Sequence, residues 1–453
     1  MRNFILLVNP FVYDVTAYDC WSKPKGLLEL GAMLKRFEFE VELIDCLYKE
    51  DEDMTVFAAS DPNIEKSTFK RFGTGRFFRQ QVAKPDFLKG FPRRYYRFGF
   101  HPDLLRRKLS RLSEKPLAVL MTGIMTYWWR GVRDTIAIVK ESLPDVSVVL
   151  GGIYPSLLPD HAKENSGADL VVAGPVSKEK LLAILTSIGM KPSDGAQREK
   201  PKNEFYYPYE KATYGVVSTS EGCYRKCSYC ASQTLRPKFI GYDINRVFAE
   251  IAQLSKRDIV DFAFYDDALL YQKEYRVVPL LTKIANALPE LRFHTPNGMH
   301  LEMIDAHIAD LMKTCGFATL RFGFETSDPD LLSRTGNKLE LGRFEEKINI
   351  LKKAGFSGDQ IGIYVMIGLP GQSIKGVEKS LAFVRNCGAS AHITEYSPIP
   401  GTPEYTKALR AGPNDFAADP ELQNNSLLPL RDPVFTFDAC NSLKNLCYAD
   451  RKY

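Results

Sequence analysis

The sequence lacks any long hydrophobic run. No apolar stretch approaches the roughly 18 residues that a membrane-spanning helix needs. The apolar stretch near the start is only five residues long and ends before Asn9-Pro10, which is too short for a secretion signal. We therefore expect a cytoplasmic protein without a membrane span.

The chain also has little net charge. Its 60 Lys and Arg and 55 Asp and Glu leave a formal charge of +5 over 453 residues. This small excess does not favour binding to polyanions, so a nucleic-acid partner is not expected. Apolar residues make up 45% of the chain, enough for a sizeable core, and the length predicts about two or three domains.

Short apolar runs alternate with amphipathic helical patterns through the first 190 residues. Strands are expected at 4–8, 41–45, 117–122, 146–150 and 169–173, and helices at 26–37, 131–143 and 178–188. Continuous apolar strands between helices are typical of a parallel sheet covered on both faces. The predicted fold class is therefore α/β, with an N-terminal doubly wound sheet of Rossmann or flavodoxin type. Such sheets bind ligands at the carboxyl ends of their strands.

Two segments interrupt this pattern. Residues 49–101 form an insertion, and residues 61–101 hold ten Lys or Arg, three acids and ten Phe or Tyr. The insertion is either a lid or basic stacking surface for an anionic or aromatic partner, or a partly ordered segment whose aromatics pack on the neighbouring domain. We favour the second interpretation. Polar residues 190–212 are predicted to be an interdomain linker.

A longer strand–helix unit repeats after the linker. Strands are expected at 215–219, 261–265, 292–295, 319–324, 361–367 and 393–397, and helices at 246–256, 275–288, 304–315, 342–354 and 375–386. This pattern predicts a partial (β/α)6 barrel of TIM type, in which the chemistry lies at the carboxyl ends of the strands. The predicted domains are 1–189, a barrel at 213–404 and a C-terminal cap at 405–453.

Three of the nine cysteines are close together in the sequence. Cys223, Cys227 and Cys230 have the spacing C-x-x-x-C-x-x-C directly after the first barrel strand. Thiolates suit iron–sulfur clusters and zinc. A structural zinc site needs a fourth Cys or His, yet no second C-x-x-C occurs and no histidine lies within sixty residues of Cys230. Three thiolates would instead hold a four-iron cluster with one iron free for a substrate.

The motif, with Tyr229 before its last cysteine, resembles that of the radical S-adenosylmethionine (SAM) enzymes. The segments IGLPGQS and SPIPGTPEY also look like the fifth- and sixth-strand segments of that superfamily. The resemblance implies a [4Fe–4S] cluster on Cys223, Cys227 and Cys230 that cleaves SAM reductively to a 5′-deoxyadenosyl radical. It also implies a low-potential electron donor, a flavodoxin or ferredoxin. The implied SAM contacts are Tyr229, Asp266, Asp267, Glu325, Gly368 and Gly371.

The chain departs from the superfamily at the second strand. Many members hold the SAM amino group with Gly-Gly-Glu there, and this chain has Asp266-Asp267. Glu325 is a candidate for the ribose hydroxyls. The alternative role for each of these acids is a salt bridge with Arg321 or Arg334 at the barrel mouth.

A doubly wound domain ahead of the barrel is similar to the cobalamin-binding branch of the superfamily. TGIMTYWWRG and GGIYPSLLPDH look like the loops of that branch. The implied cobalamin contacts are Asn9, Thr122, Gly123, Met125, Thr126, Tyr127, Gly151, Gly152, Tyr154 and Gly174. The Asp-x-His-x-x-Gly motif of other cobalamin folds is absent, which predicts cobalt without a histidine lower ligand.

These resemblances imply a cobalamin-dependent radical SAM methyltransferase that acts on an unactivated carbon of a small molecule or peptide. One alternative is a radical SAM cyclase or rearrangement enzyme, with or without cobalamin, and another is an iron–sulfur electron-transfer protein. A methylthiotransferase would need three further N-terminal cysteines, and that region has only Cys20 and Cys46. The sequence does not name the substrate.

Overall fold

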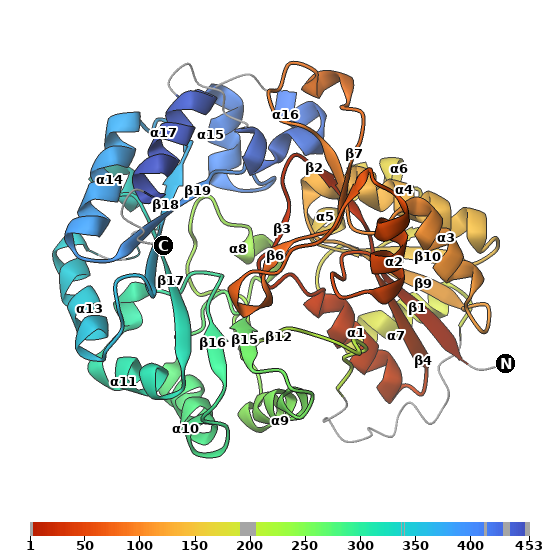
Figure 1. Cartoon of the computed structure of the whole chain (residues 1–453), viewed down its shortest axis with the longest axis horizontal. Coiled ribbons are helices and arrows are strands. Elements are labelled where there is room, and N and C mark those ends of the chain that lie inside the picture. Colours follow the sequence, from red (N-terminus) through yellow and green to blue (C-terminus); the bar gives the residue numbers. More distant parts are fainter. Residues whose placement is uncertain are drawn as a thin grey trace. The chain divides into compact units, whose positions relative to one another are not determined.

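The computed structural model describes residues 3–190, 205–336, 338, 340–411, 415–428 and 435–448. The chain divides into two compact units, Met1–Ala212 and Thr213–Tyr453 (Figure 1). Most of the predicted linker, residues 191–204, lies outside the described residues. Among the described helices, none combines the length and the apolar character that crossing a bilayer requires.

The first unit is built on a five-stranded parallel sheet. Its strands in chain order are β1 Phe4–Asn9, β4 Glu40–Asp45, β9 Ala118–Gly123, β10 Ser147–Gly152 and β11 Leu170–Val171. Their spatial order is β11-β10-β9-β1-β4, so the winding direction reverses between β1 and β9. This reversal is the switch point at which doubly wound sheets bind ligands. The predicted α/β class with a doubly wound sheet is confirmed.

Helices cover this sheet and explain why its inner strands β1, β9 and β10 are apolar runs. They are α1 Lys25–Arg36, α4 Trp129–Ser142, α5 Ile153–Leu157, α6 Pro159–Asn165 and α7 Lys178–Ser187. Every residue of β1 is buried, and α1 buries a stripe that includes Leu27, Leu28 and Leu34 against the sheet. Strands with both faces covered lose the alternation of polar and apolar side chains.

The insertion forms ordered structure within the first unit. Strands β5 Ile64–Glu65, β7 Arg79–Gln81 and β8 Tyr96–Phe98 join β2 Val12–Asp14 in an antiparallel sheet of order β2-β8-β7-β5. Helices α2 Glu52–Ser60 and α3 Pro102–Ser110 flank it, and β3 Tyr18–Asp19 pairs with β6 Gly75–Arg76. The aromatic side chains of Phe77, Phe78, Phe98 and Phe100 are buried in the cores of this unit rather than on a neighbouring domain.

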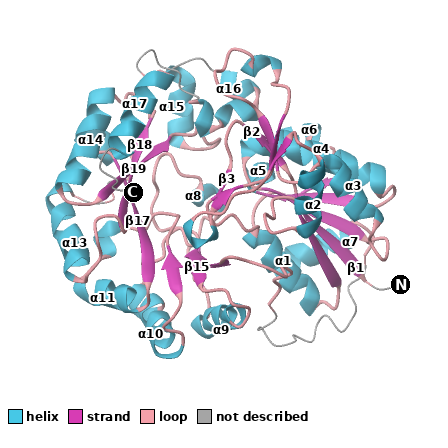
Figure 2. Cartoon of the chain, viewed as in Figure 1, coloured by secondary structure: helices cyan, strands magenta, loops and turns pink. Residues whose placement is uncertain are grey.

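The second unit contains a sheet of six parallel strands (Figure 2). Each strand of this sheet is hydrogen-bonded to the one that follows it in chain order. They are β12 Gly215–Val217, β15 Asp261–Phe264, β16 Arg292–His294, β17 Phe317–Glu325, β18 Ile361–Ile367 and β19 Ser390–Glu395. The intervening helices are α9 Ile244–Ser255, α10 Val277–Ala287, α11 Ala306–Thr314, α13 Leu341–Lys353 and α14 Ile374–Asn386. Among the described residues, β12 and β19 are the two edges of this sheet and do not pair with each other, so the predicted partial (β/α)6 barrel is confirmed.

Aromatic side chains fill part of the barrel core. The rings of Phe264 and Phe293 stack 5.4 Å apart, and Phe293 packs on Phe317 at 5.5 Å. After β19 the chain forms α15 Pro403–Ala411, α16 Asp415–Ala418, two 3-10 turns and α17 Phe437–Tyr448. Helix α17 packs against β19 and α14, so this part of the predicted cap extends the helical layer of the barrel.

Candidate functional site

The cysteine loop begins at Gly222, five residues after the end of the first barrel strand, and connects the two strands of a small hairpin, β13 Ser220–Glu221 and β14 Ile240–Gly241. Gly222 starts the loop with a φ of +78°, and a Cβ there would lie 2.4 Å from the carbonyl oxygen of Lys238. Only glycine fits this turn. The turn continues with the Cys230 amide, which donates to the Cys227 carbonyl at 3.1 Å.

Backbone amides point at two of the three thiols. The Arg225 N–H donates to the Cys223 Sγ and the Ser232 N–H to the Cys230 Sγ, each at 3.4 Å. Burial raises the pKa of Cys223 to about 11 and also raises that of Cys227, so these two thiols are protonated when no metal is bound. Metal binding replaces such protons, and amide donors stabilise sulfur ligands once they carry charge.

The donor set fits an iron–sulfur cluster better than a single metal ion. Within the described part of the chain, no three Cys, His, Asp or Glu side chains converge as one ion would require. A four-iron cluster binds each thiolate at a different iron, so its sulfur ligands need not meet at one point. Cys223, Cys227 and Cys230 therefore offer three separate ligand positions on one loop.

Tyr229 and Glu325, two predicted SAM contacts, lie together. The Tyr229 hydroxyl donates to Glu325 Oε1 at 2.7 Å, and the Lys338 ammonium donates to the same oxygen at 2.7 Å. Glu325 ends β17 with a φ of +75°, beside a register shift between β17 and β18. A Cβ on Gly323 would lie 2.4 Å from Lys338 Nζ, so this glycine makes room for the lysine. Lys338 was not predicted.

Asp266 and Asp267 have different surroundings. Asp266 is buried and accepts from the Thr219 N–H, from the Thr219 hydroxyl and from the Ser220 hydroxyl, the last two at 2.6 Å. It thus fixes the chain just before the cysteine loop. Asp267 hydrogen-bonds to Ser232, whose hydroxyl lies 3.2 Å from the Cys230 Sγ, and burial raises the pKa of this acid.

The sequence suggested salt bridges of these acids with Arg321 or Arg334, but the ion pairs of Asp266 and Glu325 are made with other cations. Asp266 pairs with Arg276 at 3.6 Å and Glu325 with Lys338 at 2.7 Å. Arg334 instead pairs with Glu404 at 3.2 Å.

Gly368 and Gly371 shape the loop after β18. Their φ values are +83° and +78°, which favours glycine at both positions. A Cβ on Gly371 would meet no atom within 4 Å, and one on Gly368 would meet only Tyr396 at 4.0 Å. Gln372 holds the loop by donating to the Met366 carbonyl at 2.8 Å. A ligand could therefore approach this backbone closely.

An aromatic and polar cluster that was not predicted borders the cysteine loop. Tyr224 stacks on Tyr271 at 4.4 Å, meets His300 edge-on at 5.2 Å and donates to Glu302 Oε1 at 2.6 Å. Burial, followed by the charges of Lys338 and Arg225, lowers the pKa of His300 to about 3. His300 is therefore a neutral side chain. Its place after the third strand was the only sequence signal for it.

The predicted cobalamin contacts gather at the carboxyl edge of the first sheet. Asn9 ends β1 and donates from Nδ2 to Asp45 Oδ1 at 2.7 Å. Gly152 ends β10 with a φ of +100°, and a Cβ there would lie 2.6 Å from Thr122 Oγ1. Gly151 beside it is open, since a Cβ would meet only one atom, at 3.9 Å. Gly123 ends β9, and Gly174 follows β11 with a φ of +74°. Side chains at these glycine positions would occupy the space along the carboxyl edge of the sheet, which the glycines leave open.

The loop after β9 carries the remaining contacts. Met125 precedes the 3-10 turn η3 Thr126–Trp128, in which Thr126 is buried and Tyr127 meets Trp128 edge-on at 5.7 Å. Trp128 donates to Asp14 Oδ2 at 2.7 Å, which ties this loop to β2. Tyr154 is fully buried, with its hydroxyl 2.7 Å from His161 Nδ1. The Tyr154 side chain is therefore enclosed by protein and supports these loops from inside.

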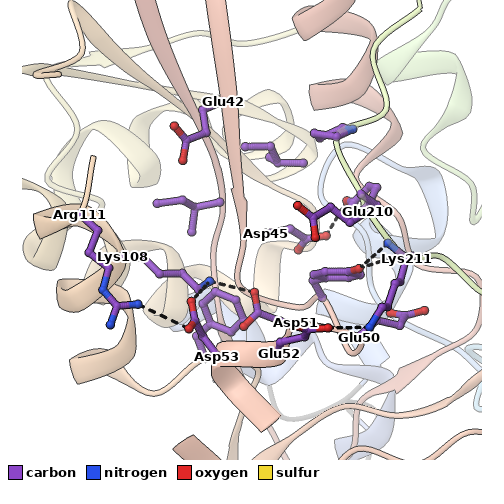
Figure 3. Close-up of a pocket in the computed structure, with 16 residues that line it drawn as sticks. Glu42, Asp45, Glu50, Asp51, Glu52, Asp53, Lys108, Arg111, Glu210 and Lys211 are labelled. Atoms are coloured by element: carbon purple, nitrogen blue, oxygen red, sulfur yellow. Dashed lines mark hydrogen bonds and ion pairs between the residues drawn. The ribbon is translucent and has the colours of Figure 1, made fainter. Parts of the chain in front are cut away.

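A pocket of about 450 Å³ lies along the edge strand β4 (Figure 3). Its acidic side chains are Glu42, Asp45, Glu50, Asp51, Glu52, Asp53 and Glu210. Lys108 bridges Asp51 and Asp53 at 2.9 and 2.8 Å, and Tyr209 donates to Asp45 Oδ2 at 2.6 Å. Many of the charged side chains that line this pocket are thus paired with one another.

Comparison with known families bears on the cysteine loop directly. Residues 217–384, which include all three cysteines and the loops after β15, β16, β17 and β18, match the Radical SAM superfamily. The match lies within the second unit and spans five of its six parallel strands, β12 in part. This match agrees with the predicted radical SAM domain, the superfamily to which the expected [4Fe–4S] cluster and SAM belong.

Curated relatives match part of the chain. An uncharacterized methyltransferase, PH0819 of Pyrococcus horikoshii, is 23% identical over 297 residues, which are 58% of this chain and 63% of the relative. A probable threonylcarbamoyladenosine tRNA methylthiotransferase of Pyrococcus abyssi is 23% identical over 58% of this chain and 64% of its own length. The chain thus spans just under two thirds of the length of these relatives.

Solved structures share the fold of both units. The radical SAM methyltransferase TsrM of Kitasatospora setae, solved with cobalamin and a [4Fe–4S] cluster, has a TM-score of 0.65 and 18% identity over 90% of this chain and 75% of its own. The cobalamin-dependent radical SAM enzyme OxsB, with aqua-cobalamin and SAM bound, has a TM-score of 0.52 and 11% identity over 90% of this chain and 55% of its own. At these identities the likeness concerns the fold.

Proposed function

We propose that the protein is a cobalamin-dependent radical SAM methyltransferase that acts on an unactivated carbon of a small molecule or peptide. The observation that supports this most is one chain that carries both a three-cysteine loop at a barrel mouth and a glycine-lined switch point on a doubly wound sheet. TsrM, which has this fold, is a methyltransferase solved with both cofactors, and a curated relative is also named a methyltransferase.

The cysteine loop would hold the cluster through Cys223, Cys227 and Cys230. When bound, the cluster supplies the electron that cleaves SAM to a carbon radical and methionine. The loop itself holds its thiols under the amides of Arg225 and Ser232, and Asp267 orients Ser232. A low-potential flavodoxin or ferredoxin is the proposed electron donor.

Asp266, Asp267 and Glu325 would have different roles in binding SAM. Both oxygens of Asp266 accept hydrogen bonds from the segment just before the cysteine loop, Thr219 and Ser220, so we assign Asp266 to positioning. Asp267 remains as the acid for the SAM ammonium, because a nearby cation would favour its charged form. Glu325, with Tyr229 and Lys338 on one oxygen, is placed to accept from the ribose hydroxyls. Gly368 and Gly371 would let SAM lie against the backbone.

The glycine edge of the first sheet would hold cobalamin. Asn9, Gly123, Met125, Thr126 and Tyr127 would face the flat ring with Thr122. Gly151, Gly152 and Gly174 would flank the extended tail, and Tyr154 would support these loops from within. Both histidines of this unit have structural partners: His101 accepts from the Asp103 amide at 3.2 Å, and His161 pairs with Tyr154. We therefore propose cobalt without a histidine lower ligand.

The second candidate is tRNA methylthiotransfer, since several relatives carry that name. The methylthiotransferases require a further cluster on three N-terminal cysteines. The first unit offers only Cys20, which is exposed, and Cys46, which is fully buried. Methyl transfer is therefore preferred.

The deciding experiment measures cofactors and SAM products together. The protein would be purified anaerobically from cobalamin-fed cells, reconstituted, and assayed for iron, corrinoid, 5′-deoxyadenosine and S-adenosylhomocysteine. Stoichiometric corrinoid with formation of both SAM products supports the methyltransferase. A loaded cluster without corrinoid would leave radical chemistry alone, as in a cyclase or rearrangement enzyme. A loaded cluster that never consumes SAM would contradict the enzyme assignment.

A further inference from the structure

Glu404 is a fully buried carboxylate in the first turn of α15. Its Oε1 accepts from the Ser228 hydroxyl at 3.0 Å, and its own backbone N–H donates to the Ser228 carbonyl at 3.0 Å. Ser228 lies between Cys227 and Tyr229. Glu404, which follows the last barrel strand, thus binds Ser228 of the cysteine loop through both its side chain and its backbone.

The charge of Glu404 is balanced on two sides. Arg334, at the end of α12 Pro329–Arg334, approaches Oε1 at 3.2 Å, and Lys407 approaches it at 3.1 Å. Arg334 also donates from Nη2 to the Pro370 carbonyl at 2.6 Å. Glu404 therefore links the loops that follow β12, β18 and β19. Buried carboxylates persist only with this kind of compensation.

Three buried polar atoms at this place lack hydrogen-bond partners. Within the described residues, these are Glu404 Oε2, the Tyr396 hydroxyl and Arg334 Nε, which faces Glu404 Oε1 only as an ion pair. A buried polar atom without a partner destabilises the fold. Glu404 is thus a poor choice for stability alone, because an apolar side chain at this position would avoid the unpaired oxygen.

The two ends of the cysteine loop have their own supports. Asp266 fixes Thr219 and Ser220 before the loop, and Ser232 contacts Cys230 at its end. The middle of the loop at Cys227 and Ser228 is the part that Glu404 reaches. Cys227 supplies the central ligand of the motif, so its position decides how the three sulfurs are spaced.

We infer that Glu404 is a positioning residue that sets the place of Cys227 by holding Ser228, and so tunes cluster retention and the cluster environment. This inference rests on the proposed function, because it presumes that the loop binds a [4Fe–4S] cluster. Glu404 acts through Ser228. Outer contacts of this kind orient metal ligands and influence metal affinity.

The test compares Ser228→Ala and Glu404→Gln with the wild type. Ser228→Ala removes the hydroxyl contact and leaves the buried charges in place. Glu404→Gln keeps the shape and an oxygen for Ser228 but removes the charge that Arg334 balances. Ser166→Ala is the matched control, since Ser166 is also a buried serine but lies in the first unit, where its hydroxyl accepts from the Ala168 amide.

The readouts are iron content after anaerobic reconstitution, iron loss to a chelator, and the EPR spectrum and midpoint potential of the cluster. We expect both variants to lose iron about tenfold faster than the wild type, with altered EPR spectra, and Ser166→Ala to match the wild type. Thermal unfolding of the apo proteins reports any general loss of stability.

Wild-type iron retention, spectrum and potential in Ser228→Ala would overturn the inference, whatever the unfolding temperatures show. If Glu404→Gln fails to fold, Ser228→Ala alone decides. If the wild type itself binds no cluster, the proposed function fails and the inference fails with it. A loaded wild type with defective variants supports both.

Discussion

The Tyr229 hydroxyl donates to Glu325 Oε1 across 2.7 Å, although 96 positions separate the two residues in the sequence. This contact joins the cysteine motif to the end of the fourth barrel strand. Lys338 adds a second donor to the same oxygen and lies 5.5 Å from the centre of the Tyr229 ring. Burial and the Glu325 charge raise the pKa of Tyr229, so its hydroxyl remains a donor at neutral pH.

Replacing Tyr229 with Phe should weaken SAM binding while the cluster is retained. The change removes one of the two donors that hold the Glu325 carboxylate, and a hydrogen bond to a charged group is worth about 1.5–3 kcal/mol. We expect about a tenfold or larger rise in the SAM dissociation constant, measured by equilibrium dialysis of the reconstituted protein. Tyr275→Phe is the control because Tyr275 is exposed. An unchanged affinity in Tyr229→Phe would remove Glu325 from the SAM site.

Replacing Cys227 with Ala should abolish the cluster. The loop would retain only two thiolates, and the remaining two cannot hold a four-iron cluster that leaves one iron for SAM. Iron and sulfide content should fall to background, with loss of the cluster absorbance. Cys315→Ala should keep the cluster, because Cys315 is buried elsewhere in the barrel and donates to the Leu281 carbonyl at 3.1 Å. Reductive SAM cleavage by Cys227→Ala would refute the cluster assignment.

Replacing Gly152 with Ala should destabilise the first unit and impair corrinoid binding. The added Cβ would lie 2.6 Å from Thr122 Oγ1 and 2.8 Å from the Gly123 carbonyl oxygen, at a φ of +100°. Backbone strain of this kind costs about 1–3 kcal/mol. Urea unfolding and corrinoid content would be measured together. Gly26→Ala is the control, because a Cβ there meets nothing within 4 Å and Ala favours the helix. Equal corrinoid content in both variants would place the cofactor elsewhere.

Acidification should destabilise the apo protein partly through His300. Burial lowers the pKa of folded His300 to about 3, below the value of about 6.5 in the unfolded chain. The unfolded state therefore binds more protons in this range, so stability falls as the pH drops through it. The loss from His300 reaches at most about 3 kcal/mol between pH 7 and pH 4.

His300→Asn should lose less stability over that interval than the wild type, in urea titrations at each pH. His307→Asn, at an exposed position, should follow the wild type. Parallel curves for His300→Asn and the wild type would show that His300 is accessible to protons when folded.

Most strands of both sheets were predictable because they are apolar runs between helical patterns. Six of six barrel strands fall within a few residues of their expected places, and the polar residues after them do meet at one edge. The antiparallel sheet of the insertion was not predicted. Its strands are two or three residues long, too short to show a period of two.

The parts of the candidate site that the sequence did not reveal depend on contacts between distant segments. Lys338 reaches Glu325 because β17 changes register beside Gly323. Glu404 lies in a segment that the sequence pattern does highlight, but its partner Ser228 is 176 positions away. Such pairs follow from the path of the whole chain, and no local pattern encodes them.

The insertion cannot be exchanged as an independent module. Its sheet includes β2, which begins three residues after the end of β1, and Asp14 of β2 accepts from Trp128 in the loop that follows β9. The loops that follow β1 and β9 are therefore hydrogen-bonded to the same sheet as the insertion. Deleting residues 49–101 would remove β5, β7 and β8 from this sheet, so we expect the deletion to disturb the loops after β1 and β9 as well as the insertion itself.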